Sequence, residues 1–301
     1  MRLVATMLSL CFALAALPAR ATEVAVTFDD LPAHASLPPG VSRVDVATRI
    51  IAALKAAHVA PVYGFVNGVQ IEREPASEPV LGLWRQAGFP LGNHTWSHVN
   101  LDQVTPEAFE AEIVRNEPLV EQHMAGADWR WLRFPFLAEG NTPEKRAAVR
   151  AFLGARGYHI ASVTMSFDDY AFNDAYARCA TKHDVAAIAG MEAMYLQAAE
   201  ESLAYSKGLS QAALGREIPF VLLMHIGAFD ARMLPRLLDL YRAHGVTFVS
   251  LPQAEADPFY AADRAAAPLA AALTLENAAL AKHIPPPPKT WNPADLDALC
   301  R

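Results

Sequence analysis

Residues 24–30 read VAVTFDD, an apolar and β-branched run that ends in two adjacent carboxylates. The run predicts a short buried strand, and similar runs follow along the chain, separated by stretches with helical spacing. The further strands are expected at 61–66, 89–91, 131–134, 158–163, 220–224 and 246–249. This alternation predicts an α/β fold whose parallel sheet is covered on both faces or closed into a barrel. Seven strands in one uninterrupted series favour a seven-stranded (β/α) barrel over an open doubly wound sheet.

Prolines and N-caps mark where several helices begin. Thr105-Pro106-Glu107 and Thr142-Pro143-Glu144 each place a proline at the first helical position, directly after a capping threonine. Other helices are expected at 44–57, 78–87, 185–206 and 234–244, with an Ala-rich helix near 261–281. The run Pro285–Pro288 predicts a stiff, extended spacer. We therefore divide the chain into a main domain at 22–252 and a helical, proline-rich C-terminal appendage at 253–301.

Composition limits the classes of protein to which this chain can belong. Of its 301 residues 53% are hydrophobic and 19% are charged, which describes a folded globular chain. The 25 Lys and Arg against 32 Asp and Glu give a net charge of −7. A nucleic-acid binder needs a basic face to neutralise phosphates, so this balance argues against that class.

The first 21 residues predict a cleaved secretory signal peptide. Arg2 precedes the apolar run Leu3–Leu17, and Pro18-Ala19-Arg20-Ala21 then gives a small-x-small ending. The run is too short to span a bilayer comfortably, so we expect no membrane span after cleavage. The sequence thus predicts an exported protein, either periplasmic or secreted.

Two cysteines, Cys179 and Cys300, remain after removal of the signal peptide. An even count in an oxidising compartment allows a disulfide that would tie the C-terminal tail to the body. Spacing alone does not decide whether the two sulfurs form a bond. The sequence also leaves the oligomeric state open.

Polar clusters follow five of the expected strands. Besides Asp29-Asp30 they are residues 92–98 (GNHTWSH), 133–136 (RFPF), 166–170 (SFDDY) and 223–225 (LMH). The carboxyl ends of parallel strands meet at one face of a barrel, where such barrels build their active sites. We therefore expect these five clusters to converge.

A histidine pair indicates metal chemistry. His94 and His98 are four residues apart, so one helical turn would bring both imidazoles to the same side of a metal ion. One carboxylate of Asp29 and Asp30 could complete a three-ligand site with positions left open for water and substrate. The other carboxylate would then be free to take a proton from that water.

The ordered set Thr-Phe-Asp-Asp, His-Thr-x-x-His, Arg-x-Pro-Phe, Asp-Asp-Tyr and Leu-x-His resembles the polysaccharide deacetylase family (NodB homology, carbohydrate esterase family 4). The resemblance extends over about residues 23–251 and makes the main domain a catalytic one. It implies a distorted seven-stranded (β/α) barrel. It also implies a metal-dependent hydrolase that removes acetyl groups, mostly N-acetyl, from sugar polymers with a divalent metal, commonly Zn²⁺, with Co²⁺ as a substitute.

The resemblance assigns a role to each motif. The implied metal ligands are Asp30, His94 and His98. Asp29 is implied as the general base, and Arg133 as the residue that orients it.

The last three motifs supply the remaining implied roles. The backbone N–H of Phe136 would help to bind the oxyanion, and His225 would protonate the leaving amine. A carboxylate of the fourth motif would position His225; Asp168 and Asp169 are both candidates, and the register favours Asp169.

The chain departs from the family pattern at two places. Ser166 stands where the family has the first acid of the fourth motif, and Tyr170 replaces a tryptophan. In the loop 137–140 the glycine comes later than usual, which would reshape the substrate groove.

Three functions are compatible with these residues. The leading one is an exported deacetylase of a sugar chain such as chitooligosaccharide or peptidoglycan. An O-acetyl xylan esterase or small-amide hydrolase would use the same site, and a barrel without catalysis could bind glycans only. Five aromatic residues next to the motifs could stack on sugars or simply pack: Trp96, Phe134, Tyr170, Phe172 and Phe229. His34 is expected to be a solvated loop residue.

Overall fold

Seven parallel strands form the centre of the protein, whose computed structural model describes residues 21–292 and 294–301. The predicted signal peptide, apart from Ala21, lies outside the described residues. The strands are β1 (Thr22–Leu31), β2 (Tyr63–Val66), β3 (Leu91–Asn93), β4 (Trp131–Leu132), β5 (His159–Ile160), β6 (Phe220–His225) and β7 (Val246–Phe248). Their order is β5-β4-β3-β2-β1-β6, and β7 also pairs with β1.

The sheet curls until its two end strands approach each other. Just beyond β5, Met165 forms a parallel bridge with Leu222 of β6. Val24 of β1 pairs with both Phe220 of β6 and Phe248 of β7, so these two strands lie on opposite edges of β1. β7 therefore takes the edge of β1 that β2 occupies further along. The result is the distorted seven-stranded (β/α) barrel that the sequence predicts, distorted because β4 and β5 have only two residues each.

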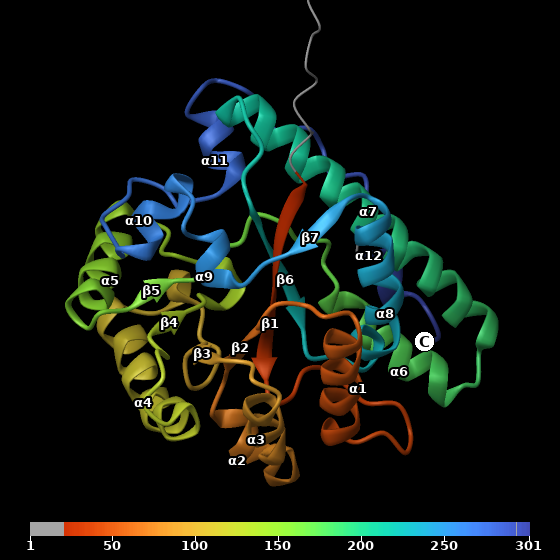
Figure 1. The fold of residues 1–301 in the computed structure, drawn as a ribbon. Helices are drawn as coiled ribbons and strands as arrows, with labels where there is room; N and C mark the ends of the chain where they lie inside the picture. Colours follow the sequence, from red (N-terminus) through yellow and green to blue (C-terminus); the bar gives the residue numbers. More distant parts are fainter. Residues whose placement is uncertain (1–20, 293) are drawn as a thin grey trace, which may run out of the picture.

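Helices surround this sheet (Figure 1). The long ones are α1 (Arg43–Ala56), α3 (Pro79–Gln86), α4 (Pro106–Met124), α5 (Pro143–Ala155), α6 (Tyr170–Thr181), α7 (Val185–Leu214) and α8 (Ala228–Ala243). The side chains of Thr105 and Thr142 accept hydrogen bonds from the N–H groups of Ala108 and Lys145, so both predicted caps are confirmed. Short helices are α2 (Val69–Arg73), α9 (Leu251–Ala254), α10 (Ala261–Arg264), α11 (Leu275–Leu280) and α12 (Ala294–Asp297).

Four helices differ from their predictions, and one of them is α8, which begins at Ala228 and not at the expected residue 234. The helix α6 was not expected, although Phe172, Ala175 and Cys179 are buried at helical spacing along it. The helix α7 continues to Leu214, beyond the expected end at 206. The single Ala-rich helix expected near 261–281 is wrong: α10 and α11 are separated by a segment that contains Pro268, which cannot continue a helix.

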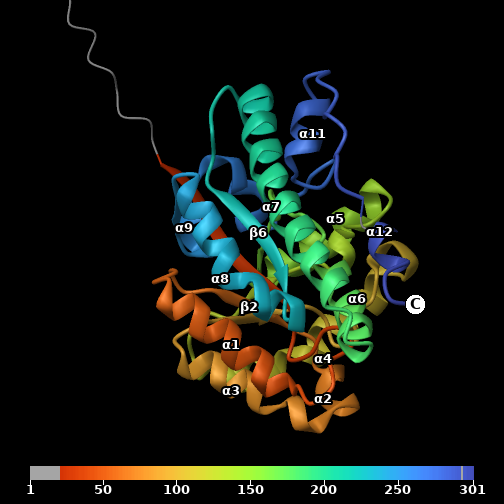
Figure 2. The ribbon, with the colours of Figure 1, turned by 90° about the vertical axis from the view of Figure 1, so that its right-hand side faces the viewer.

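The C-terminal segment packs onto the barrel and shares its hydrophobic core. Tyr260, Leu275, Ala279 and Leu296 are all buried in that core, and α11 lies beside α7 (Figure 2). A disulfide joins Cys179 of α6 to Cys300, with the two Cα atoms 5.1 Å apart. The pairing that the sequence left open is thus present. Among the described residues, no helix combines the length and the apolar character that a bilayer crossing requires.

Candidate active site

The ends of the strands converge on one pocket of about 440 Å³, as the position of the motifs predicts. All five polar clusters contribute to its lining or to the layer directly behind it. The lining residues are Asp29, Asp30, His34, His94, His98, Phe134, Phe136, Leu137, Ser166, Asp168, Tyr170, Leu223 and His225.

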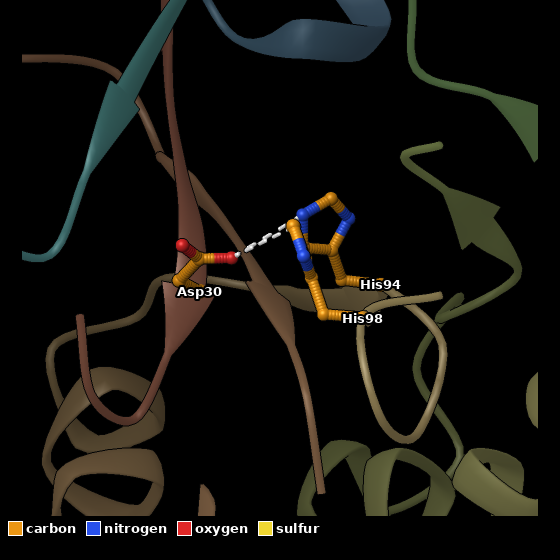
Figure 3. A group of neighbouring side chains, drawn as sticks. All are labelled: Asp30, His94 and His98. Carbon is orange, nitrogen blue, oxygen red and sulfur yellow. Dashed lines mark ion pairs between the residues drawn. The ribbon is translucent and has the colours of Figure 1, made fainter. Parts of the chain in front are cut away.

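Asp30, His94 and His98 face one another inside this pocket (Figure 3). Oδ1 of Asp30 lies 3.5 Å from Nε2 of His94 and 3.4 Å from Nε2 of His98. This oxygen is buried and has no hydrogen-bond partner among the described residues. Burial alone would raise the pKa of Asp30, but the imidazoles of His34 and His94 beside its carboxylate hold it well below its usual range.

These three residues fit a zinc ion. One carboxylate oxygen and two imidazole nitrogens are ligands that Zn²⁺ accepts, and tetrahedral ligands about 2.0–2.1 Å from the ion lie about 3.4 Å from one another. The distances of 3.5 Å and 3.4 Å around Asp30 Oδ1 match that spacing. Nδ1 of His94 is 2.7 Å from the carbonyl oxygen of Arg133, an interaction that fixes the ring and leaves Nε2 turned toward Asp30.

The histidine pair lies on an irregular loop after β3, so the expected helical turn is wrong. Thr95 and His98 both have positive φ, at 63° and 56°, which breaks a helix. Asn67 donates hydrogen bonds to the carbonyl oxygens of His94 and Thr95 and holds the loop in place. Asp30 also has positive φ, at 68°. A residue other than glycine in this left-handed conformation costs about 1–3 kcal/mol, and such residues cluster at functional sites.

Asp29 and Arg133 form a buried ion pair behind the ligands. Nη1 of Arg133 lies 3.1 Å and 3.3 Å from the two carboxylate oxygens of Asp29. Further hydrogen bonds run from Arg133 to Ala161 O and to Oγ1 of Thr27, so the guanidinium spans the barrel interior. Oδ2 of Asp29 is 3.7 Å from Nε2 of His94, which places this carboxylate next to the ligands.

On the other side of the pocket, His225 contacts Asp169 and not Asp168. One Asp169 oxygen accepts a hydrogen bond of 2.6 Å from the His225 backbone N–H, and the other lies 3.1 Å from Nδ1 of the ring. Burial alone would lower the pKa of His225, but the Asp169 carboxylate raises it to about 10. Asp168 instead lines the pocket, with a φ of 57°.

Phe136 occupies a tight turn at the mouth of the pocket. Its φ is 59°, and its ring lies 4.5 Å from the ring of His98, centroid to centroid. The following N–H groups, of Leu137 and Ala138, donate to the carbonyl oxygens of Phe134 and Pro135.

His34 is the site residue that sequence reasoning placed wrongly. Instead of a solvated loop side chain, it lines the pocket, with Nδ1 2.7 Å from Oδ2 of Asp30. Its ring lies 4.8 Å from the ring of His225. The loop after β1 has no periodic pattern, so no local signal could have located this ring.

Only two of the five aromatic candidates reach the pocket. Phe134 and Tyr170 line it. Phe172 and Phe229 are fully buried and stack on each other in the core. Trp96 lies under the guanidinium of Arg115, 4.4 Å from the ring centroid, and does not line the pocket.

A curled parallel (β/α) barrel with an Asp-His-His group at its carboxyl edge is the architecture that the NodB-type resemblance implied. A family model described as polysaccharide deacetylase matches residues 17–158, which include the first three motifs. This match covers just under half of the chain and confirms the resemblance to the polysaccharide deacetylase family that the motifs indicate.

One similar protein of known activity is the peptidoglycan-N-acetylglucosamine deacetylase of Bacillus cereus. It is 28% identical over 119 residues, which are 40% of this chain and 38% of that protein. The match therefore spans well under half of the relative's length.

Solved structures share the fold. The chitin deacetylase of the fungus Colletotrichum lindemuthianum has a TM-score of 0.53 at 20% identity, over 78% of this chain and 88% of that one. A CE4 family pseudoenzyme from Bacillus anthracis has a TM-score of 0.54 at 12% identity, over 78% of this chain and 66% of that one. At these identities the likeness is one of fold alone. Since the fold serves a deacetylase and a pseudoenzyme, only the site residues can argue for catalysis.

Proposed function

We propose that this protein is an exported, metal-dependent deacetylase that hydrolyses acetyl groups, chiefly N-acetyl, on a sugar oligomer or polymer. The observation that carries the proposal is the unpartnered Oδ1 of Asp30, which faces the Nε2 atoms of His94 and His98 beside a second carboxylate, Asp29. The family match and the named activity of the Bacillus cereus relative support it. Export rests on the sequence pattern of residues 1–21.

Asp30, His94 and His98 would hold the divalent ion, Zn²⁺ or Co²⁺. A bound divalent ion supplies Lewis acidity, which polarises an acetyl carbonyl and makes water a stronger acid near neutral pH. Asp29 then acts as the general base that takes the proton of the attacking water. Arg133 donates to both oxygens of Asp29 and so fixes the plane of the base.

The tetrahedral oxyanion that forms needs a hydrogen-bond donor. We assign this role to the backbone N–H of Phe136, because the tight turn of Phe136 lines the pocket. Removal of one such donor typically lowers the rate by about 10²–10³-fold.

His225 protonates the leaving amine, which cannot depart as an anion. Asp169 holds the Nδ1 side of the ring, so Nε2 is the nitrogen left to deliver the proton. Because Asp169 raises the pKa of His225 to about 10, the ring stays protonated at neutral pH. The products are acetate and a free amine.

The rim of the pocket suits a sugar ring. Phe136, Leu137 and Tyr170 are exposed to 63%, 43% and 45%, and all three line the pocket. An aromatic and apolar rim over a polar floor can cover the C–H faces of a sugar while polar groups below reach the acetyl group.

The same residues could hydrolyse an O-acetyl ester. One measurement separates ester substrates from amide substrates. An alkoxide leaves more readily than an amide anion, so loss of the general acid should slow amide hydrolysis more. We expect His225→Ala to lower the rate on N-acetyl substrates by about 10²–10⁴-fold, and the rate on O-acetyl substrates less.

The test is acetate release by the mature protein, loaded with Zn²⁺ or Co²⁺ and again after chelation. The substrates are N-acetylglucosamine oligomers, peptidoglycan fragments and acetylated xylan. Asp29→Asn should lower release by about 10²–10⁴-fold. Asp239→Asn removes an exposed carboxylate on α8 and serves as the charge-matched control. No release from any substrate at full metal occupancy would refute the proposal and favour a glycan-binding barrel.

A further inference from the structure

We propose that His34 is a positioning residue for Asp30: its Nδ1 fixes one carboxylate oxygen, so that only the other is presented to His94 and His98. The inference rests on the metal site of the proposed function. It concerns a residue of the loop after β1, outside the five motifs.

The two oxygens of Asp30 have different partners. Oδ2 lies 2.7 Å from Nδ1 of His34, whereas Oδ1 lies 3.5 Å and 3.4 Å from Nε2 of His94 and His98. A carboxylate with one oxygen tied by a short hydrogen bond cannot rotate freely about its Cβ–Cγ bond. His34 therefore selects a one-oxygen mode of ligation for Asp30, because a two-oxygen mode would require Oδ2 to leave His34.

The loop that carries His34 is itself held from two sides. The carbonyl oxygen of His34 accepts a hydrogen bond of 2.7 Å from Arg43 of α1, which also pairs with Glu74 at 2.9 Å. Two residues further, the N–H of Ser36 donates to Asp174 of α6 at 2.8 Å. These anchors set the position of the imidazole before any ligand arrives, which is the property expected of a residue that orients a metal ligand.

The ring of His34 also has a buried environment. Its side chain is 16% exposed, and its ring is tilted by 39° to the ring of His225, with the two centroids 4.8 Å apart. Since Nδ1 is turned to Asp30, the ring lies between Asp30, a proposed metal ligand, and His225, the proposed general acid. A smaller side chain would release Asp30 and leave a gap beside His225.

The experiment compares metal binding in His34→Ala, His34→Asn and the wild-type chain. An Asn side chain can place an N–H near the position of Nδ1, so it is the conservative variant. His123→Gln on α4 removes a histidine that does not line the pocket and is the matched control. Zn²⁺ affinity is measured by competition with a chelator, and the visible spectrum of the Co²⁺-loaded protein reports the coordination number. Circular dichroism checks that each variant is folded.

We expect His34→Ala to bind Zn²⁺ about 10–100-fold more weakly, as is typical when a partner of a metal ligand is removed. The Co²⁺ absorption should weaken, because a freed Asp30 can bind through both oxygens and raise the coordination number. His34→Asn should recover most of the affinity and the spectrum, and His123→Gln should leave both unchanged.

Zn²⁺ affinity and a Co²⁺ spectrum unchanged in His34→Ala would overturn the inference, even in an enzyme that releases acetate. Equal losses in His34→Ala and His34→Asn would also overturn it, since the donor would then be irrelevant. If the wild type binds Zn²⁺ but releases no acetate, the proposed function fails while the His34 result still stands on the binding data.

Discussion

Two buried clusters of charged side chains, each built around an arginine, use their carboxylates in different ways. In the pocket cluster, Arg133 contacts Asp29, which lies beside Asp30 and the two histidines. In the second, which we term the support cluster, Arg150 contacts Glu139 and Asp263.

The support cluster is satisfied within itself. Arg150 lies 2.8 Å from Glu139 and 2.5 Å from Asp263, and it also donates to the carbonyl oxygens of Ala262 and Ala267. The second oxygen of Asp263 accepts a hydrogen bond of 2.6 Å from Ser162. In the pocket cluster, by contrast, Oδ1 of Asp30 accepts no hydrogen bond from the part of the chain that the structure describes, and it faces two imidazole nitrogens. Burial of charge is common to both clusters, so the feature that distinguishes the pocket cluster is a partnerless carboxylate oxygen that faces two imidazole nitrogens.

The support cluster links the C-terminal segment to the pocket. Glu139 follows Phe136 by three residues, and Asp263 belongs to α10. Ser162 contacts both clusters, because its carbonyl oxygen lies 3.4 Å from Nη2 of Arg133 while its hydroxyl donates to Asp263. The segment at 253–301 thus helps to hold the loop that forms one wall of the pocket.

The largest effect should come from Asp30→Asn, which breaks the pocket cluster at its unpartnered oxygen. Loss of a charged ligand should empty the metal site and lower acetate release by about 10³-fold, since metal stabilisation of the transition state is worth several kcal/mol. The free energy of unfolding of the metal-free protein should fall by less than in Arg150→Met, because an Asn oxygen can still accept the hydrogen bond from His34. Zinc content, acetate release and urea unfolding check this. A loss of stability as large as the one expected for Arg150→Met would contradict the comparison.

Arg150→Met should show the opposite pattern. It leaves Glu139 and Asp263 buried without their cation, and breaking a buried pair in this way costs about 3–5 kcal/mol in the free energy of unfolding. Zn²⁺ affinity of the folded protein should change little, because Arg150 contacts no ligand. Urea unfolding measures the loss, and Arg232→Met, which breaks an exposed pair with Glu192, should cost less than about 1 kcal/mol.

Asp169→Asn should move the pH dependence of catalysis. With the Asp169 carboxylate raising the pKa of His225 to about 10, kcat/KM of the wild type should fall only above about pH 9. Without that charge His225 should deprotonate at lower pH, so the alkaline limb should shift down by more than about one unit. Asp168→Asn is the matched control. An equal shift in both variants would show that the contact between Asp169 and His225 is not what sets the pKa of His225.

The smallest expected effect is the pH dependence that Glu139 of the support cluster gives to the free energy of unfolding. Burial, with Asp263 nearby, raises the pKa of Glu139 from 4.5 to about 7. The folded state therefore binds a proton more tightly than the unfolded chain does. The resulting stabilisation is full below about pH 4.5 and is lost as the pH rises to about 7. Urea unfolding across this window should show a steeper decline for the wild type than for Glu139→Gln; parallel curves would contradict the assignment.

The amino-acid sequence determined the barrel and the set of side chains at its carboxyl edge. The β-branched runs and the capping threonines Thr105 and Thr142 are local signals, and they fixed the strands and two helix starts. Parallel topology then brings strand ends together whatever their separation in sequence, so the motifs of Asp29, His94 and His225 could be placed at one face in advance.

The tertiary structure alone decided which side chains touch there. Asp169 rather than Asp168 contacts His225, and His34, which was expected to be solvated, contacts Asp30. Local sequence pattern also could not predict the disulfide between Cys179 and Cys300 or the packing of the C-terminal segment on the core. Asp169 and His225 are 56 residues apart, Cys179 and Cys300 are 121 apart, and His34 lies on the irregular loop after β1, so no local periodicity relates these residues to their partners. Local sequence encodes elements and their buried faces, whereas the partners of loop residues are chosen only when the whole chain has packed.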